Sequence, residues 1–518
     1  MDQAVTTKST AITVMKAIPD ADDLLRRDFR MLIGGELVEA SDGATLETVN
    51  PATGEVLPPV PNAGSTDVER AVAAARTAQP KWQGLPFRER HDMIRGLTEV
   101  LRRRADEFGL LDTLNTGNVY SAMRRDAVNG AEMIEYFAAA AHEIKGEVTH
   151  LDDHLHYTRR EPYGVVLRLL PFNHPIASLA TALAAPLLTG NTIIMKPSPH
   201  SPLSALAFGA AVRDRLPPGV LNIVIGDNER ASAPLICHPG VDRIALIGSV
   251  EAGKAVMRMA ADRLVPLTLE LGGKNPLIVF PDADIERAVD VAVAGMNFLW
   301  QAHSCGSTSR VLVHKSTEGV FVERLAERVS RIKVAMPMEA DAEMGAISFK
   351  ALYDRCLGYV ASGCDEGARL VTGGTRPADP ALARGFFMRP AVFSHARPQM
   401  RIAREEIFGP IMTVIAWDDY DAMLEVANGL FYGLTAVIMT NDLNVAHRTA
   451  EALQVGYVEI NGPVSFALGS PFGGFKQSGV GREGSLDELL GYTQIKSINL
   501  RLDPRSSVAV RLAGTASH

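Results

Sequence analysis

A cysteine and a glutamate are the residues of this sequence that could do chemistry together. Cys305 lies between Ser304 and Gly306, and Glu270 precedes the glycine pair Gly272-Gly273. A thiol attacks a carbonyl carbon as the thiolate, and a free cysteine is mostly protonated at neutral pH, so a nucleophilic cysteine needs a base or a positive environment. Glu270 could be that base, or it could activate a water molecule. The alternative for Cys305 is a small, buried, apolar side chain.

Short motifs around these two residues occur in one order between about Arg30 and Ile498. They are Asn50-Pro51-Ala52-Thr53-Gly54-Glu55, Pro171-Phe172-Asn173-His174-Pro175, Lys196-Pro197-Ser198, Pro218-Gly219-Val220-Leu221-Asn222, Leu269-Glu270-Leu271-Gly272-Gly273-Lys274, the segment from Cys305 to Arg310, Glu405-Glu406-Ile407-Phe408-Gly409-Pro410, and Pro471-Phe472-Gly473-Gly474-Phe475-Lys476-Gln477-Ser478-Gly479. With these motifs the sequence resembles the NAD(P)-dependent aldehyde dehydrogenase superfamily. The resemblance implies oxidation of an aldehyde to the acid through a thiohemiacetal and a thioester on Cys305, with Glu270 activating the hydrolytic water.

The resemblance implies two further catalytic residues. The Asn173 side-chain amide and the backbone N–H of Cys305 would hold the oxyanion of the intermediate. Glu483 is a second carboxylate that could handle protons, with a surface ion pair as the alternative. Relatives that pass the acyl group to coenzyme A typically lack a glutamate at the position of Glu270, so its presence favours the hydrolytic, non-acylating branch.

One predicted junction between a strand and a helix fits a phosphate group. Gly248 and Ser249 follow the predicted strand 243–247, and a helix N-terminus there would offer free N–H groups, with Ser249 as the N-cap. The resemblance implies NAD or NADP as the cofactor and adds the other contact positions, which gives the set Lys196, Ser198, Gly248, Ser249, Glu406, Phe408, Phe172 and Leu271. Pro199 occupies a position where many NAD-preferring relatives carry glutamate. The choice between NAD and NADP therefore stays open, with NAD slightly favoured.

The substrate pocket is predicted only by position in the family. Its candidate walls are His174, Leu299, Ser304, Phe466 and Phe472. They are mostly apolar and include no arginine or lysine, which favours an aromatic or medium-length apolar aldehyde. Two departures from the family pattern matter. His303 could tune the thiol or only pack beneath it, and Ala182 replaces a lysine found in many relatives, so a proton route through that lysine would have to differ.

Composition limits the class of protein. The chain has 518 residues, 47% of them apolar and 22% charged, with a net charge of −8 and four cysteines. These values disfavour a disordered chain, and no apolar run is long enough for a membrane span. The absence of a long basic run disfavours nucleic-acid binding, and the cysteine spacing predicts no metal site. Without a secretory signal pattern, the expected location is cytoplasmic.

Alternating strand and helix patterns predict an α/β protein. Apolar runs at 165–170, 192–195, 221–225, 243–247 and 267–271, with helix patterns between them, indicate a parallel sheet covered on both faces, and a second set follows at 277–280, 310–313, 411–415, 435–439 and 457–460. With the resemblance, we expect an aldehyde dehydrogenase-like fold of two doubly wound parallel-sheet domains plus a small β bridging domain. The expected boundaries are a polar tail at 1–28, a cofactor-binding domain at 29–145 and 162–271, a catalytic domain at 272–475, and bridging strands at 146–161 and 485–505.

The resemblance also implies a homodimer or homotetramer assembled through the bridging strands. Two other functions remain as alternatives. A catalytically silent relative would serve as a binding protein, and a cysteine esterase or thiol hydrolase would use Cys305 without a nicotinamide cofactor. Nucleotide binding would distinguish the hydrolase, since that enzyme has no use for NAD or NADP.

Overall fold

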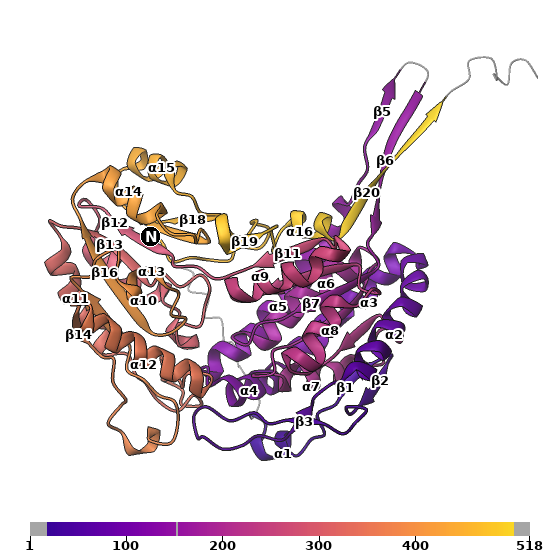
Figure 1. Cartoon of the computed structure of the whole chain (residues 1–518), viewed down its shortest axis with the longest axis horizontal. Helices are drawn as coiled ribbons and strands as arrows, with labels where there is room; N and C mark the ends of the chain where they lie inside the picture. The colour runs from indigo at the N-terminus through magenta and orange to yellow at the C-terminus, as the bar shows by residue number, and fades with distance from the viewer. Residues whose placement is uncertain (1–17, 152–153, 502–518) are drawn as a thin grey trace, which may run out of the picture.

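The computed structural model describes residues 18–151 and 154–501 of the chain. Two large β-sheets form the centres of two lobes, and a narrow third sheet projects from the first lobe as an arm (Figure 1). Most strands of the large sheets are parallel and buried, which requires helices on both of their faces. The predicted α/β class and its two parallel-sheet units are confirmed.

The first sheet has the strand order β19-β11-β10-β7-β8-β9-β1-β2. The five strands from β11 to β9 run parallel, and β19, β1 and β2 are each antiparallel to a neighbour. The strands are β1 (Met31–Ile33), β2 (Glu36–Val38), β7 (Val165–Leu169), β8 (Thr192–Lys196), β9 (Leu221–Ile223), β10 (Arg243–Ile247), β11 (Leu267–Glu270) and β19 (Gly479–Val480). The predicted parallel strands are therefore all present, with ends shifted by at most two residues.

Helices surround this sheet because its strands are apolar on both sides. They are α2 (Ser65–Gly84), α3 (Phe87–Arg103), α4 (Ala105–Thr116), α5 (Tyr120–Ala140), α6 (Pro175–Leu188), α7 (Leu203–Val212), α8 (Ala233–Cys237), α9 (Val250–Ala260) and α16 (Leu486–Gly491). A π-helical turn, η2 (Asn228–Ser232), precedes α8, and a short two-stranded sheet joins β3 (Thr45–Leu46) to β4 (Val60–Pro61).

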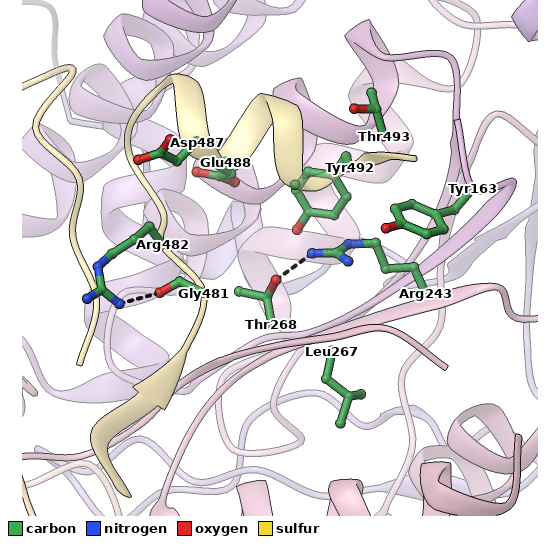
Figure 2. Close-up of a pocket in the computed structure, with 11 residues that line it drawn as sticks. Tyr163, Arg243, Leu267, Thr268, Gly481, Arg482, Asp487, Glu488, Tyr492 and Thr493 are labelled. Carbon is green, nitrogen blue, oxygen red and sulfur yellow. Dashed lines mark hydrogen bonds between the residues drawn. The ribbon is translucent and has the colours of Figure 1, made fainter. Parts of the chain in front are cut away.

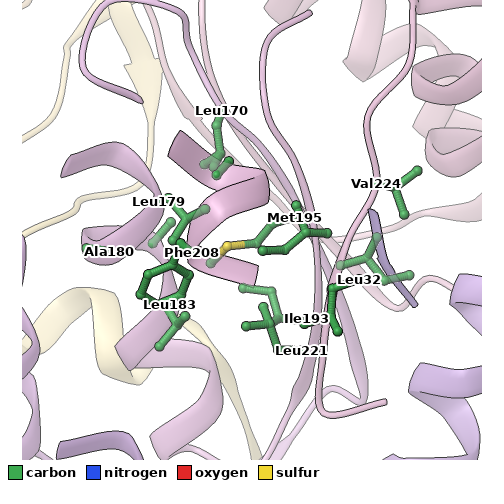
Figure 3. Close-up of a cluster of buried hydrophobic side chains, with 14 of the residues drawn as sticks. Leu32, Leu170, Leu179, Ala180, Leu183, Ile193, Met195, Phe208, Leu221 and Val224 are labelled. Carbon is green, nitrogen blue, oxygen red and sulfur yellow. The ribbon is translucent and has the colours of Figure 1, made fainter. Parts of the chain in front are cut away.

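Side chains from α6, α7 and the sheet interlock in the core of the first lobe (Figure 3). Phe208 of α7 lies among Leu179 and Leu183 of α6 and Met195 of β8, and it is fully buried. Its ring centroid lies 6.1 Å from that of Phe108 on α4. One aromatic side chain thus joins two helices to the sheet that carries the site.

We expect Phe208→Ala to lower the free energy of unfolding by about 3–5 kcal/mol, because it removes a buried ring and leaves a cavity in a packed core. Thermal or urea unfolding followed by circular dichroism measures the change. Val320→Ala, at a position on the second lobe that is 54% exposed, is the control. Equal midpoints for the two variants would contradict the expected role of this ring.

The second sheet has the order β14-β15-β16-β13-β12-β17-β18, and only β14 is antiparallel. Its strands are β12 (Pro276–Val279), β13 (Arg310–His314), β14 (Arg369–Thr372), β15 (Ala391–Ser394), β16 (Ile411–Trp417), β17 (Thr435–Met439) and β18 (Tyr457–Ile460). The accompanying helices are α10 (Ile285–Gly295), α11 (Glu318–Ser330), α12 (Lys350–Asp365), α13 (Arg401–Arg404), α14 (Tyr420–Asn428) and α15 (Leu443–Ala452). All five strands predicted here are present, whereas β14 and β15 were not predicted.

The arm is an antiparallel sheet of order β20-β6-β5, built from β5 (Val148–Leu151), β6 (His154–Pro162) and β20 (Thr493–Arg501). It extends away from both lobes (Figure 1) and exposes Val148, Ile495 and Leu500 by half or more. One part of segment 485–505, which was expected to form bridging strands, is not a strand. Leu486–Gly491 forms helix α16, which packs against α5 and α6. Residues 502–505 lie outside the described residues.

The predicted polar tail at 1–28 contains a short helix, α1 (Ala21–Leu25), which begins at an Asp20 N-cap. Leu24 of this helix is buried in the first core, so an apolar contact fixes this part of the segment. Residues 1–17 lie outside the described part of the chain. The domain boundaries themselves stay a prediction. None of the helices in the described ranges has the length and apolar character needed to cross a bilayer.

Candidate active site

A cavity of about 900 Å³ lies between the two lobes, where the parallel strands of the first sheet end. Ligands of open α/β sheets bind at this edge, outside the carboxyl ends of the strands. The lining includes Asn173 after β7, Glu270 at the end of β11 and Cys305 from the second lobe. The structure therefore brings together the three residues that we predicted as the core of the chemistry.

Cys305 lies in a loop between the 3-10 turn η4 (Phe298–Trp300) and β13. Gln301 and Ala302, which are four and three residues before this cysteine, have φ angles of 51° and 59°, in the left-handed region that disfavours a side chain. Asn275 supports the loop, since its Nδ2 donates to the carbonyl oxygens of Cys305 at 2.6 Å and Ser307 at 3.0 Å. A specific amide thus supports the part of the backbone that presents the thiol.

The Cys305 thiol is not a thiolate in this environment. Burial, together with the carboxyl groups of Glu406 and Glu270, raises its pKa to about 12, although backbone N–H groups of the loop oppose the shift. The thiol is therefore protonated at neutral pH. Attack on a carbonyl would require a nearby group that accepts the proton.

Glu270 is a carboxyl group without a hydrogen-bond partner in the described structure. Both of its oxygen atoms are buried and unpaired, so they are free to accept a proton from a thiol or from water. Burial raises its pKa well above the usual range. The neighbouring Glu483 carboxylate also raises this pKa, whereas the charge of Arg482 lowers it. Gly473 makes this position possible, because a Cβ there would approach the Glu270 Oε1 to 2.8 Å.

Asn173 presents its side-chain amide at the same cavity. Its Nδ2 donates to the carbonyl oxygen of His303 at 2.6 Å, and Asn118 Nδ2 donates to the carbonyl oxygen of Asn173 at 2.8 Å. A primary amide has two N–H donors, so one of them is left for an oxyanion after the bond to His303. The amide is thereby oriented next to the cysteine loop.

His303 packs beneath the loop and carries no charge there. Its ring is fully buried, Nδ1 lies 3.1 Å from the Ser348 hydroxyl, and the ring is parallel to that of Phe408 at a centroid distance of 5.9 Å. Burial lowers its pKa to about 3. A neutral imidazole at physiological pH cannot stabilise a thiolate by charge, so the structure favours packing as the role of His303.

Most of the predicted cofactor contacts line the same cavity, and one does not. The residues on the lining are Lys196, Ser198, Gly248, Ser249, Glu406, Phe408 and Phe172. Leu271 is absent from the lining because its side chain is buried, in a position that a Cβ at Gly253 of α9 would contact. Seven positions thus lie on one surface, and the eighth is a core residue of the first lobe.

The N-terminus of α9 opens onto the cavity as the sequence predicted. Ser249 is the N-cap and its Oγ accepts a hydrogen bond from the backbone N–H of Ala252 at 3.1 Å. A Cβ at Gly248 would meet no atom closer than 3.4 Å, so the turn before the helix is open. Lys196, at the end of β8, is buried, which lowers its pKa to about 8. The cavity thus has helix N–H groups and a lysine along one wall.

Glu406 reaches the cavity from the second lobe and meets a glycine pair of the first. The backbone N–H of Gly273 donates to its Oε1 at 3.0 Å, and a Cβ at Gly272 would collide with its carboxyl group. Burial raises the Glu406 pKa to about 7, although the hydrogen bond from the Gly273 N–H and the charge of Lys274 lower it. Its other oxygen remains available to accept hydrogen bonds from a ligand.

Glu483 does not lie on the cavity, and it has a partner that the sequence did not indicate. Its Oε1 accepts from the Arg168 Nη1 at 2.7 Å, and the arginine side chain is 1% exposed. The alternative of an ion pair is therefore observed, but it is buried rather than on the surface. A role of Glu483 in proton handling stays a prediction.

The predicted substrate walls separate into two groups. The His174 ring lies 5.2 Å from the Trp300 ring, and Phe466 lies beside Gly306, with its ring 4.7 Å from that of Phe472. Leu299 instead packs in a small cluster with Val119, Ala335 and Ala342. Trp300 was missed by the sequence reasoning, although it directly follows Leu299 and is one of three tryptophans in the chain.

Comparison with known proteins agrees with this geometry. The sequence model described as "Aldehyde dehydrogenase family" matches residues 37–498. Aldehyde dehydrogenase tropH of Talaromyces stipitatus is 42% identical over 475 residues, which cover 90% of this chain and 92% of that protein. The chain belongs to the aldehyde dehydrogenase family. Its members are oxidoreductases that act on aldehydes.

Solved structures of aldehyde dehydrogenases share the whole fold. The NAD+ complex of an aldehyde dehydrogenase from Bacillus cereus has a TM-score of 0.90 at 35% identity, covering 93% of this chain and 98% of that one. Betaine aldehyde dehydrogenase from Staphylococcus aureus, also with NAD+, has a TM-score of 0.90 at 32% identity, covering 93% and 97%. The expected aldehyde dehydrogenase-like fold is confirmed.

The cavity of this aldehyde dehydrogenase has donors and acceptors that fit a dinucleotide. Helix N–H groups and Lys196 suit phosphate and ribose oxygens, the Glu406 carboxyl suits ribose hydroxyls, and Phe408 offers an apolar surface beside the cysteine loop. Within residues 18–151 and 154–501, no group of three or more histidine, cysteine, aspartate or glutamate side chains could hold a metal ion.

Proposed function

We propose that this protein oxidises aldehydes to carboxylic acids with NAD or NADP, through a thioester on Cys305 that is hydrolysed by water. The observation that supports the proposal is a single cavity lined at once by Cys305, Glu270 and Asn173 and by the groups that fit a dinucleotide. When bound, NAD(P)+ supplies the hydride acceptor of the reaction.

The residues of the chain have three tasks in the proposed reaction. Glu270, which has no competing hydrogen bond, accepts the proton of the Cys305 thiol and later that of the hydrolytic water. The free N–H of the Asn173 amide and the backbone N–H of Cys305 hold the developing oxyanion. Asn275 and the strained backbone at Gln301 and Ala302 keep the cysteine loop in place.

NAD is the cofactor that we favour for this chain. Both of the similar structures described above are NAD+ complexes. Pro199 in the cavity lining provides no carboxylate to repel a 2′-phosphate beside Lys196, so NADP is also an accepted cofactor in the proposal. Nucleotide titrations of the protein with NAD and with NADP compare the two affinities directly.

An apolar or aromatic aldehyde is the proposed substrate class. Phe466 lies beside Gly306 of the cysteine loop and against Phe472, Trp300 lies just before that loop, and none of the predicted wall positions is an arginine or a lysine. A remote carboxylate on the substrate would therefore lose its hydration without gaining a charged partner at these walls.

A substrate panel tests the proposed function. We expect NAD(P)H formation with benzaldehydes and alkanals, at a kcat/KM roughly tenfold or more above that with semialdehydes, since one unpaired charge costs at least a few kcal/mol in an apolar pocket. Absorbance of NAD(P)H is followed with both cofactors. Activity confined to charged aldehydes would contradict the substrate class. Cofactor binding without turnover of any aldehyde would indicate a silent binding protein, and ester hydrolysis without cofactor binding would indicate a hydrolase.

We further propose that the protein forms a homodimer or homotetramer through the arm, and that it acts in the cytoplasm. A three-stranded sheet with exposed Val148, Ile495 and Leu500 has little core of its own and would be stabilised by a second copy. All four cysteines are free, which suits a reducing compartment. Sedimentation of the full chain tests the oligomeric state.

A further inference from the structure

A strip of polar side chains leads away from Glu270 across one face of the first sheet. The strand register places Arg168 of β7, Ala245 of β10 and Thr268 of β11 in one row. Glu270 lies two residues beyond Thr268, and alternate residues of a strand point to the same face. Because the side chain of Ala245 is small, the row has space for polar groups on a face that is otherwise apolar.

Buried polar groups from the C-terminal part of the chain cover this strip. Arg168 Nη1 donates to the carboxylate of Glu483 and to the hydroxyl of Tyr492. Arg243 lies on the same face of β10, two residues before Ala245. It donates to the Thr268 hydroxyl at 2.6 Å and lies 4.9 Å from the centroid of the Tyr492 ring. The proposed reaction uses none of Arg168, Arg243 and Tyr492.

Glu488 is a buried carboxyl group at the far end of this strip. It lies on α16, is 5% exposed, and accepts a hydrogen bond from the backbone N–H of Gly484 through Oε2 at 2.8 Å. Together with Thr268 and Arg243 it lines a second cavity of about 420 Å³, separate from the cofactor cavity and open to the surface. Figure 2 shows Glu488 descending from α16 and Arg243 rising from the sheet into the space around Thr268.

We propose that Glu488 and its cavity form a proton outlet for Glu270, by which the proton taken from the hydrolytic water reaches solvent without passing through the cofactor cavity. This inference rests on the proposed function. The cavity has polar side chains on its lining and space for several water molecules, which could connect the carboxyl groups over the Thr268 hydroxyl. Such an outlet would remain open while substrate and cofactor fill the other cavity.

The proton balance of this outlet closes within each turnover. Before hydrolysis, the proton that Glu270 took from the Cys305 thiol leaves by this route. Water then gives its hydroxide to the thioester carbon and its proton to the Glu270 carboxylate. The C–S bond breaks, and the sulfur leaves as a thiolate that takes its proton from the carboxylic acid product. The proton then passes from Glu270 through water to the Glu488 carboxylate, and from Glu488 to water in the second cavity. Both carboxylates and the Cys305 thiol are regenerated, and two protons, one from the thiol and one from the hydrolytic water, have been released to solvent for each carboxylate product.

The electrostatic surroundings of Glu488 suit such a group. Burial and the Glu483 carboxylate together raise its pKa to about 8, although Arg168 opposes the rise. A carboxyl group with a pKa near neutrality can both accept and release a proton at physiological pH. The charged and titratable groups around it are Glu483, Arg168 of β7, Arg243 of β10, Glu270 of β11, Tyr136 of α5 and Tyr492.

Glu488→Gln tests the outlet, because the amide keeps the acceptor for the Gly484 N–H but cannot carry a proton. We expect the hydrolysis step to slow roughly tenfold on its high-pH plateau, less than the ~10²-fold or greater loss of a group that exchanges the proton with the reacting water itself. The NAD(P)H burst and KM should change little, and Glu488→Asp should recover most of the rate. Ester hydrolysis by Cys305 gives a second, cofactor-free measure of the same step.

The pH profile separates a proton outlet from a mere charge effect. The Glu488 carboxylate raises the pKa of Glu270, so a purely electrostatic role predicts that Glu488→Gln moves the rising limb to lower pH with an unchanged plateau. The outlet predicts a lower plateau. Asp487→Asn is the matched control, since Asp487 is the next residue on α16, lines the same cavity and is exposed.

A second variant blocks the outlet without altering Glu488. Gly491 lines the cavity, and a Cβ there would meet Arg243 only at an ordinary 3.6 Å, so Gly491→Met should fill the space and also lower the plateau. If Glu488→Gln fails to fold, the plateau rate of Gly491→Met tests the outlet in its place. If Glu488→Gln and Gly491→Met reach the same plateau rates as the wild type and Asp487→Asn, the outlet is overturned. An inactive wild type would instead contradict the proposed function.

Discussion

Cys305→Ala should abolish aldehyde oxidation, with a loss on the order of 10⁶-fold, because the proposed reaction carries the acyl group on this sulfur. The substitution removes one atom from a half-buried side chain, and the bonds from Asn275 to the loop involve only backbone carbonyls. The fold and the cofactor cavity should therefore be retained. NAD(P)H formation with the best aldehyde of the panel measures the loss, and nucleotide titration measures the retained binding.

Cys364→Ala is the matched control for this experiment. Cys364 is a free, exposed cysteine on α12, so its removal tests any general effect of losing a thiol. Turnover by Cys305→Ala at more than about a hundredth of the wild-type rate, with intact cofactor binding, would show that another group carries the acyl chain. Loss of both turnover and nucleotide binding would point to a damaged loop rather than to a missing nucleophile.

The parallel strands could be predicted because their sequences are apolar on both faces. The run from Val165 to Leu170 and its counterparts have few alternatives to a buried strand, and the register then fixes the edge at which Asn173, Glu270 and the α9 N-terminus meet. Helices α2 to α5 were assigned only as part of a long segment. Strands β14 and β15 carried no signal that separated them from neighbouring loops.

The supporting contacts of the site could not be predicted, since they join residues far apart in the chain. The amide of Asn275 holds the cysteine loop, and Asn118 holds the backbone of Asn173 from the loop between α4 and α5. Arg168 is a charged residue within an apolar strand, which signals a buried partner but cannot identify Glu483 as that partner. Leu299 was chosen by family position, whereas the ring of Trp300 makes the contact with His174.

Glu270→Gln should allow a burst of NAD(P)H and then stall at the thioester. Glutamine has the size of glutamate but cannot accept the proton of the hydrolytic water, so the steady rate should fall by about 10²–10⁴-fold. The burst should be slower than in the wild type, because Glu270 also accepts the Cys305 thiol proton. It should still approach one equivalent per cysteine, because hydrolysis follows hydride transfer and is slowed as well. Rapid mixing followed by NAD(P)H absorbance measures the burst, and mass spectrometry of the quenched protein detects the acyl group on Cys305.

The pH dependence of hydrolysis independently checks the proposal that Glu270 is the base for the hydrolytic water. Burial and the Glu483 carboxylate raise the Glu270 pKa, so the group is protonated over a wider pH range than an ordinary carboxyl. Only the deprotonated form accepts a proton, and the wild-type rate should therefore rise with pH through this raised pKa. The residual hydrolysis of Glu270→Gln should lack that rise. An unchanged steady rate or an unchanged rising limb in the variant would show that a different base activates the water.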